Sequence, residues 1–138
     1  MSLRIHSDSS ESSPLLVVGS IAFDNVITPY GQKDGILGGA ASYCSFAASY
    51  FCEVRMVGVI GNDFGDEHLN RLLTREIDLE GVQKDVSGPT FFWKGKYHEN
   101  MKGRDTLVTE LNVLEKFNPK VNSEFSGSEI ILLGNLHP

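Results

Sequence analysis

The sequence lacks a long apolar run, an excess of positive charge and a secretion signal. No segment approaches the ~20 apolar residues that a helix needs to cross a bilayer, and no basic stretch precedes an apolar one at the N-terminus. Among 138 residues, 18 acidic against 12 basic side chains leave a net charge of -6. Such a balance disfavours binding to nucleic acid or anionic membranes. We therefore expect a cytoplasmic protein with neither as a partner.

Cysteine is scarce, and no metal-binding or nucleotide-binding motif is present. Cys44 and Cys52 lie in one predicted helical stretch, where eight residues rise ~12 Å, beyond the ~7 Å limit for a disulfide. We expect both to be small buried side chains. The histidines fall in unrelated segments, which predicts no metal site. Neither GxxxxGK[ST] nor GxGxxG occurs, so the chain has no recognisable loop for nucleotide phosphates.

Residues 1–14 are polar and rich in serine, which predicts a disordered leader. From residue 15 onward, short apolar runs alternate with segments of helical length. The expected strands are 15–18, 54–60 and 130–133, and the expected helices are 40–51 and about 64–76. Because these strands are not polar at every second residue, they favour a parallel sheet flanked by helices. The fold class is therefore α/β, in one domain over 15–138.

Two segments break this alternation. Residues 25–37 contain one proline and two glycines among β-branched residues, which is typical of a short irregular β excursion. Residues 90–97 and 106–113 are β-type runs joined by a polar stretch, which predicts a hairpin. Both segments lie outside the expected parallel sheet.

Asp24 and the pair Gly38-Gly39 are candidates for ligand binding. Asp24 follows the first strand, where open α/β sheets place ligands, and a carboxylate can accept hydrogen bonds from adjacent hydroxyls of a polyol. An Asx turn that closes the strand is an equally simple interpretation of Asp24. The glycine pair precedes a predicted helix, where backbone N–H groups can approach a ligand, although an ordinary flexible loop has the same pattern.

Aromatic residues gather in the first strand of the hairpin. They are Phe91, Phe92, Trp93 and Tyr97, and because alternate side chains of a strand face opposite sides, one side can stack on a ligand. The alternative is that these residues pack the hairpin on the body or on a second subunit. Asp63 lies just before the second predicted helix and is expected to cap it.

In combination, these segments resemble the N-terminal half of the PfkB/ribokinase family of carbohydrate and nucleoside kinases. The resemblance rests on the order of Val18-Gly19-Ser20-Ile21-Ala22-Phe23-Asp24, Gly38-Gly39-Ala40-Ala41-Ser42, Val57-Gly58-Val59-Ile60-Gly61-Asn62-Asp63-Phe64-Gly65, the hairpin and Leu133-Gly134-Asn135. It implies a ribokinase-like, Rossmann-type sheet with a small β lid at about 25–37 and 89–114. It also implies that the sequence stops before the ATP-binding half.

The resemblance assigns roles to particular residues. Asp24 matches the aspartate that holds substrate hydroxyls, Gly38-Gly39 matches the glycine pair beside the substrate, and Asn112 falls near the substrate. Tyr43 stands where the family commonly has an asparagine, as does Ala22, which makes a nucleoside at least as plausible as a free sugar. The candidate substrate-binding residues are therefore Asp24, Gly38, Gly39, Tyr43, Phe92, Trp93, Asn112 and Asn135.

The family also implies ATP and Mg²⁺ as cofactors and a homodimer formed through the lid. Its Gly-Ala-Gly-Asp segment, which supplies the anion hole and the catalytic base, does not occur here. We therefore expect a substrate-binding half of a sugar or nucleoside kinase that is inactive alone. The alternative is a non-catalytic binding or dimerisation module that uses the hairpin.

Overall fold

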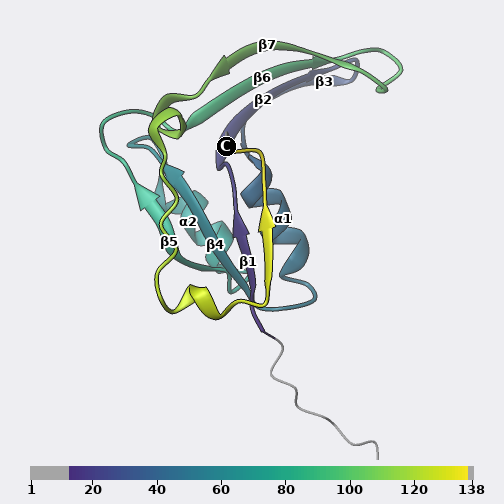
Figure 1. The fold of residues 1–138 in the computed structure, drawn as a ribbon. Coiled ribbons are helices and arrows are strands. Elements are labelled where there is room, and N and C mark those ends of the chain that lie inside the picture. The colour runs from purple at the N-terminus through teal and green to yellow at the C-terminus, as the bar shows by residue number, and fades with distance from the viewer. Residues whose placement is uncertain (1–12, 137–138) are drawn as a thin grey trace, which may run out of the picture.

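Four parallel strands form the centre of the computed structural model, which describes residues 13–136. They are β1 (Leu15–Val18), β4 (Val54–Ile60), β5 (Asp78–Lys84) and β8 (Ile130–Leu133), in the order β5-β4-β1-β8 (Figure 1). The predicted parallel sheet and α/β class are confirmed. The strand β5 was missed because Asp78, Glu80, Gln83 and Lys84 make its sequence largely polar. Its position at the edge of the sheet tolerates such residues.

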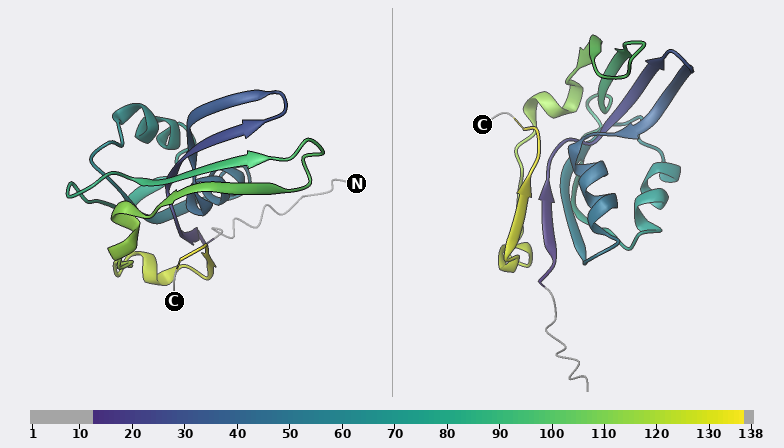
Figure 2. Two further views of the ribbon diagram at one scale, coloured as in Figure 1. Left: turned by 90° about the horizontal axis from the view of Figure 1, so that it is seen from above. Right: turned by 90° about the vertical axis from the view of Figure 1, so that its right-hand side faces the viewer.

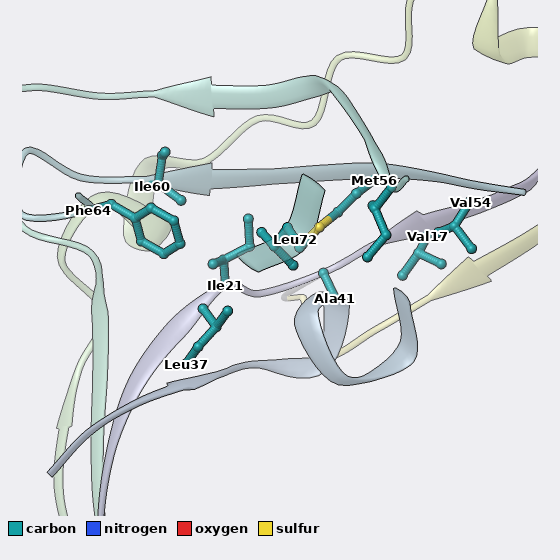
Figure 3. Close-up of a cluster of buried hydrophobic side chains, with 10 residues drawn as sticks. Val17, Ile21, Leu37, Ala41, Val54, Met56, Ile60, Phe64 and Leu72 are labelled. Atoms are coloured by element: carbon teal, nitrogen blue, oxygen red, sulfur yellow. The ribbon is translucent and has the colours of Figure 1, made fainter. Parts of the chain in front are cut away.

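Helices α1 (Ala40–Ala48) and α2 (Asp66–Leu73) cover one face of this sheet (Figure 2). Both are shorter than predicted. The cluster of buried side chains between the helices and the sheet includes Val17, Met56 and Leu72, each at most 1% exposed (Figure 3). Burial of such side chains contributes about 1.5–3 kcal/mol each, so this layer is the main source of stability.

The opposite face of the sheet carries a smaller cluster of Leu16, Val18, Val57 and Phe125. Phe125 belongs to a short 3-10 helix, η2 (Phe125–Gly127), and a second one, η1 (Asn112–Lys116), follows the hairpin. Strand β8 lies at the edge of this face with its apolar side chains exposed, such as Leu133 at 75%. An apolar hollow of about 580 Å³ lies along β1 and β8.

A second sheet stands on the first (Figures 1 and 2). It contains β2 (Ala22–Thr28), β3 (Gly31–Gly38), β6 (Phe91–Tyr97) and β7 (Arg104–Glu110) in the order β3-β2-β6-β7. Strands β2 and β6 are parallel, and the other pairs are antiparallel. The predicted hairpin is present. The expected irregular excursion is instead a regular antiparallel pair with one register shift after Asp24. We call this second sheet the lid sheet.

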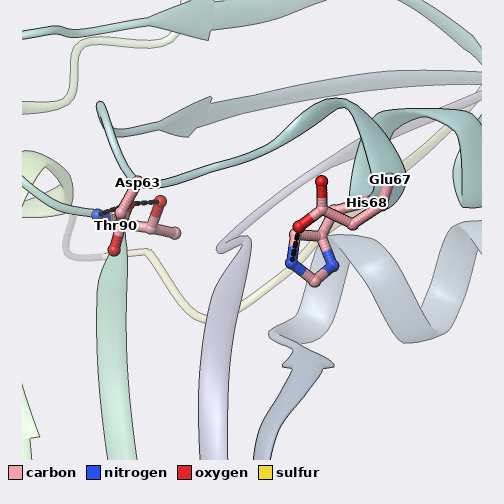
Figure 4. A network of polar contacts seen from close by, with 4 residues as sticks. All are labelled: Asp63, Glu67, His68 and Thr90. Carbon is pink, nitrogen blue, oxygen red and sulfur yellow. Dashed lines mark hydrogen bonds and ion pairs between the residues drawn. The ribbon is translucent and has the colours of Figure 1, made fainter.

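The buried Thr90 joins the two sheets where β6 begins (Figure 4). The Thr90 backbone N–H and hydroxyl both donate to Asp63 Oδ1, at 2.7 and 2.6 Å. The Gly61 N–H, at the end of β4, donates to the Thr90 hydroxyl at 3.0 Å. The expectation that Asp63 caps α2 was therefore wrong. Helix α2 begins later, with Gly65 as its N-cap. The Asp63 carboxylate accepts hydrogen bonds from Thr90 instead.

Other predictions concern the termini and the cysteines. The predicted leader at 1–14 lies almost entirely outside the described residues. Cys44 and Cys52 are both free, and they are partly exposed where full burial was expected, because each sits at the margin of the core. Among residues 13–136, no helix has the length and apolar character required to cross a membrane.

Candidate functional site

A hollow of about 380 Å³ lies between the lid sheet and the end of the parallel sheet. This volume is in the range of small-molecule sites. Its walls combine a carboxylate, a guanidinium, an amide and several aromatic rings. The lining residues are Asp24, Val26, Gly39, Tyr43, Phe91, Trp93, Tyr97, Arg104 and Asn135. The hollow therefore offers both hydrogen-bonding groups and stacking surfaces to a ligand.

One face of the lid sheet forms the upper wall. Phe91, Trp93 and Tyr97 alternate along β6 and therefore point to the same side, whereas Phe92 points to the other. Asp24 on β2 is the register partner of Trp93, so the carboxylate and the indole lie next to each other on this face. The spacing of aromatics in β6 thus places three rings on the wall of the hollow that also carries the Asp24 carboxylate.

The indole of Trp93 is held in place from three sides. Gly95, two residues along the same face, leaves the room that the indole occupies, because a Cβ there would overlap the ring. The indole N–H donates to the Thr106 hydroxyl at 3.2 Å, and the Arg104 guanidinium carbon lies 5.4 Å from the ring centroid. A fixed aromatic platform of this kind presents its free face to a ligand without a large loss of side-chain entropy.

Asp24 lies within β2 and not in the turn that the alternative interpretation required. Gly38 is its neighbour on β3, and a Cβ there would overlap the Asp24 carboxylate. Partial burial raises the pKa of the Asp24 carboxyl above its ordinary value, and the positive charge of Arg104 opposes this rise. A partly desolvated carboxylate has a strong demand for hydrogen-bond donors, which ligand hydroxyls can meet.

The floor of the hollow is organised by the buried Ser20. Its hydroxyl donates to Asn135 Oδ1 at 2.7 Å and accepts from the Ala40 N–H at 3.1 Å. Gly39 enters this turn with φ of 91°, and a Cβ there would collide with the Ser20 carbonyl. Because the Asn135 carbonyl oxygen is occupied by Ser20, the Asn135 amide can present its N–H donors to the hollow.

The hollow brings together five of the eight predicted site residues: Asp24, Gly39, Tyr43, Trp93 and Asn135. Gly38 lies behind Asp24, and Phe92 points away from the hollow. The Asn112 amide donates to the Thr90 carbonyl at 2.9 Å, so this side chain is used in the junction of the sheets. Burial and the negative charge of Asp24 raise the pKa of Tyr43.

The predicted site residues did not include Ser20 or Arg104, and Tyr97 was named only among the aromatic residues of the hairpin strand, one side of which can stack on a ligand. Period-two spacing from Trp93 could have indicated Tyr97. Arg104 reaches the hollow because it is the register partner of Tyr97, and the sequence alone does not reveal this pairing. Ser20 gave no signal, because a serine after a strand is common in loops.

Metal ions in proteins are held by groups of His, Cys, Asp or Glu side chains that lie close together. Within residues 13–136, no group of three or more His, Cys, Asp or Glu side chains could hold a metal ion. Of the residues that the structure describes, Asp24 is the only carboxylate that lines the hollow. These residues do not fit a magnesium site, so we assign no step of phosphoryl transfer to them.

No family model matches the sequence. Among curated proteins, the cytidine kinase of Thermococcus kodakarensis is 34% identical over 103 residues, which cover 74% of this chain and 36% of that protein. Among solved structures, the ribokinase from Cryptococcus neoformans in complex with ADP superimposes with a TM-score of 0.72 at 18% identity. The superposition covers 88% of this chain and 42% of the ribokinase chain.

A nucleoside kinase of Methanocaldococcus jannaschii, described as an archaeal member of the ribokinase family, has a TM-score of 0.69 at 14% identity and covers 91% of this chain. This chain has the ribokinase-family fold. The resemblance to the N-terminal half of this family is therefore confirmed. The nucleoside kinase of Burkholderia thailandensis in complex with inosine also matches, with a TM-score of 0.64 at 19% identity over 72% of this chain.

The chain spans less than half the length of these relatives, from 36% of the cytidine kinase to 46% of the archaeal nucleoside kinase. These relatives are named as a cytidine kinase, two nucleoside kinases and a ribokinase. The part of the ribokinase-family fold seen here contains the lid sheet, the hollow beneath it and the parallel sheet that supports both.

Proposed function

We propose that this chain is the substrate-binding half of an ATP-dependent kinase that phosphorylates a hydroxyl of a sugar or nucleoside. One observation carries the proposal. The Asp24 carboxylate lies in the hollow between the lid sheet and the parallel sheet, beside Gly39 at the start of α1. In this arrangement, Asp24 accepts hydrogen bonds from ligand hydroxyls and thereby orients the ring of the acceptor.

The aromatic wall supports an acceptor with a flat face. Trp93 offers a ring platform next to Asp24, and Tyr43 and Tyr97 line the same hollow. Aromatic rings stack on the apolar face of a sugar and on a nucleobase. The names of the relatives agree with a nucleoside, since one is a cytidine kinase and another was solved with inosine.

Phosphoryl transfer itself would rest on parts that these residues do not supply. It depends on positioned electrostatic stabilisation of the transferring group together with Mg²⁺. ATP and Mg²⁺ therefore belong to the complete enzyme, and we expect this chain alone to bind an acceptor without phosphorylating it. A cytoplasmic location, where ATP is abundant, is part of the same proposal.

Ligand binding to Asp24 can be measured directly, because Trp93 is the only tryptophan in the chain and lines the hollow. Titration of its fluorescence with ribose, cytidine and inosine should give saturable binding that Asp24→Ala weakens at least tenfold. Asp34→Asn, at an exposed carboxylate of the same sheet, is the matched control and should bind as the wild type does. Equal affinities for wild type and Asp24→Ala would overturn the role given to Asp24.

A second candidate function is dimerisation through the lid sheet. The observation that favours it is the exposure of apolar side chains on this sheet and its turns, with Leu107 at 50% and Tyr30 at 87%. Exposed apolar surface of this kind marks protein interfaces. Light scattering of the double variant Phe92→Ser, Leu107→Ser should show a smaller mass than the wild type, with ligand binding unchanged. A wild type that is monomeric at high concentration excludes this function.

A further inference from the structure

Arg104 is the cationic side chain of the hollow, and it comes from the outermost strand of the lid sheet. As the register partner of Tyr97, it lies on the ligand-facing side of this sheet. Its guanidinium lies near the Trp93 ring. Within residues 13–136 this guanidinium takes part in no ion pair, whereas the adjacent Asp105 is paired with His98 at 3.1 Å. The five N–H donors of Arg104 are therefore available to a ligand.

The hollow has two charged lining residues of opposite sign, Asp24 and Arg104. Asp24 on β2 and Arg104 on β7 lie on the same, ligand-facing side of the lid sheet, with β6 between their strands, and among residues 13–136 they form no ion pair. A ligand between them meets acceptor groups at one end and donor groups at the other. Its hydroxyls suit Asp24, and its own hydrogen-bond acceptors suit Arg104.

The planar geometry of the Arg104 guanidinium favours ligands that carry two adjacent hydrogen-bond acceptors. Its parallel N–H bonds match two acceptors side by side, as in bidentate pairs. Guanine and hypoxanthine present O6 beside N7, and cytosine presents O2 beside N3. Adenine places an amino donor beside N7, so the same fork meets a donor there. Ribose without a base offers only hydroxyl oxygens, each of which carries an O–H donor as well, and it has no flat ring to stack on Trp93.

We propose that Arg104 selects nucleosides whose base carries two adjacent hydrogen-bond acceptors, such as cytidine and inosine, over adenosine and free ribose. The inference rests on the proposed function, because it takes the hollow beneath the lid sheet as the acceptor site. In this role, Arg104 is a specificity-determining residue. Trp93 stacks on the base, and the Arg104 guanidinium lies over the same ring, with its carbon 5.4 Å from the ring centroid.

The test measures dissociation constants by Trp93 fluorescence for cytidine, inosine, adenosine and ribose. The proteins are the wild type, Arg104→Met, Arg104→Lys and Lys102→Met. Lys102 lies in the turn of the same hairpin, outside the lining of the hollow, so Lys102→Met removes an equal charge at a matched place. Thermal unfolding of each variant verifies that the chain remains folded.

The wild type should bind cytidine and inosine about tenfold more tightly than adenosine, a difference of about 1.4 kcal/mol. Arg104→Met should remove this preference, with less than about a twofold change for adenosine. Arg104→Lys should remove most of it, because an ammonium keeps the charge but lacks the planar fork. Lys102→Met should leave all four constants unchanged.

Three outcomes overturn the inference. If the wild type binds nucleosides and Arg104→Met weakens the binding of all of them equally, Arg104 attracts ligands without selecting among them. The proposal that the hollow is the acceptor site would then still hold. If gluconate, a sugar acid titrated in the same way as a fifth ligand, binds more tightly than cytidine, Arg104 recognises a carboxylate. If the wild type binds none of these ligands, the proposed function and the inference both fail.

Discussion

The two sheets of this molecule differ in what surrounds them. In the parallel sheet, β4 is buried along nearly its whole length, and helices cover one face. In the lid sheet, β7 is exposed at almost every position, and one face borders the hollow. The first sheet therefore has the packing that provides stability. The second has the open surface and free polar groups that ligand recognition requires, and such regions contribute little to global stability.

The largest difference in the free energy of unfolding should appear between a substitution in the core of the parallel sheet and one in the lid sheet. Met56→Ala removes a fully buried side chain on β4, and the cavity should lower the free energy of unfolding by about 2–5 kcal/mol. Leu107→Ala, at a half-exposed position on β7, should change it by less than about 0.5 kcal/mol. Urea denaturation measures both. Equal effects would show that the lid sheet is part of the stabilising core.

Substitution at the junction of the two sheets should have the next largest effect on the free energy of unfolding. Thr90→Val removes the hydroxyl that donates to Asp63 and accepts from Gly61, which leaves the buried Gly61 N–H without its partner. We expect a loss of about 1–3 kcal/mol in urea denaturation. Thr90→Ser keeps the hydroxyl and is the matched control. A loss for Thr90→Ser as large as for Thr90→Val would mean that the methyl group matters more than these hydrogen bonds.

The ionised Asp24 carboxylate, which we propose binds ligand hydroxyls, should lower the folding stability of the chain at neutral pH. Because its pKa is raised in the fold, its stabilising contribution is present below the ordinary value of 3.8 and is lost as the pH rises through the raised value. At pH 7, Asp24→Asn should therefore unfold at a slightly higher temperature than the wild type. Its free energy of unfolding should be higher by less than about 1 kcal/mol, because the group is half-exposed. This difference should disappear near pH 3. Thermal melts across pH 3–8 measure it, and a less stable Asp24→Asn at pH 7 would contradict the direction of the shift.

The smallest effect on stability is expected at the apolar edge of the parallel sheet. Leu133→Thr replaces an exposed side chain on β8, and the free energy of unfolding should change by less than about 0.5 kcal/mol. Self-association should decrease, because a bare apolar edge strand favours pairing with other chains. Sedimentation at several concentrations measures this. Unchanged association would place the contact elsewhere.

The sequence predicted the parts of the fold that local patterns encode. The apolar runs of β1, β4 and β8 and the hairpin were found because their side chains follow simple burial patterns. Strand β5 was missed because a polar edge strand resembles a loop. Asp63 was misplaced because its partner, Thr90, is 27 residues away. Arg104 could not be found for the same reason, since only strand pairing places it over the hollow.

The contact between the sheets at Thr90 lies at the base of the lid sheet. A small rotation there would displace the far end of this sheet by a larger distance. Ala22, Gly38 and Phe91 are register partners at the base of this sheet, and from there β6 extends for seven residues. At ~3.3 Å per residue, this strand is about 23 Å long. A rotation of about 10° at the base would then move the far end by about 4 Å, roughly the thickness of a nucleobase. Small rearrangements of Thr90 and Asp63 would thus be amplified at the mouth of the hollow.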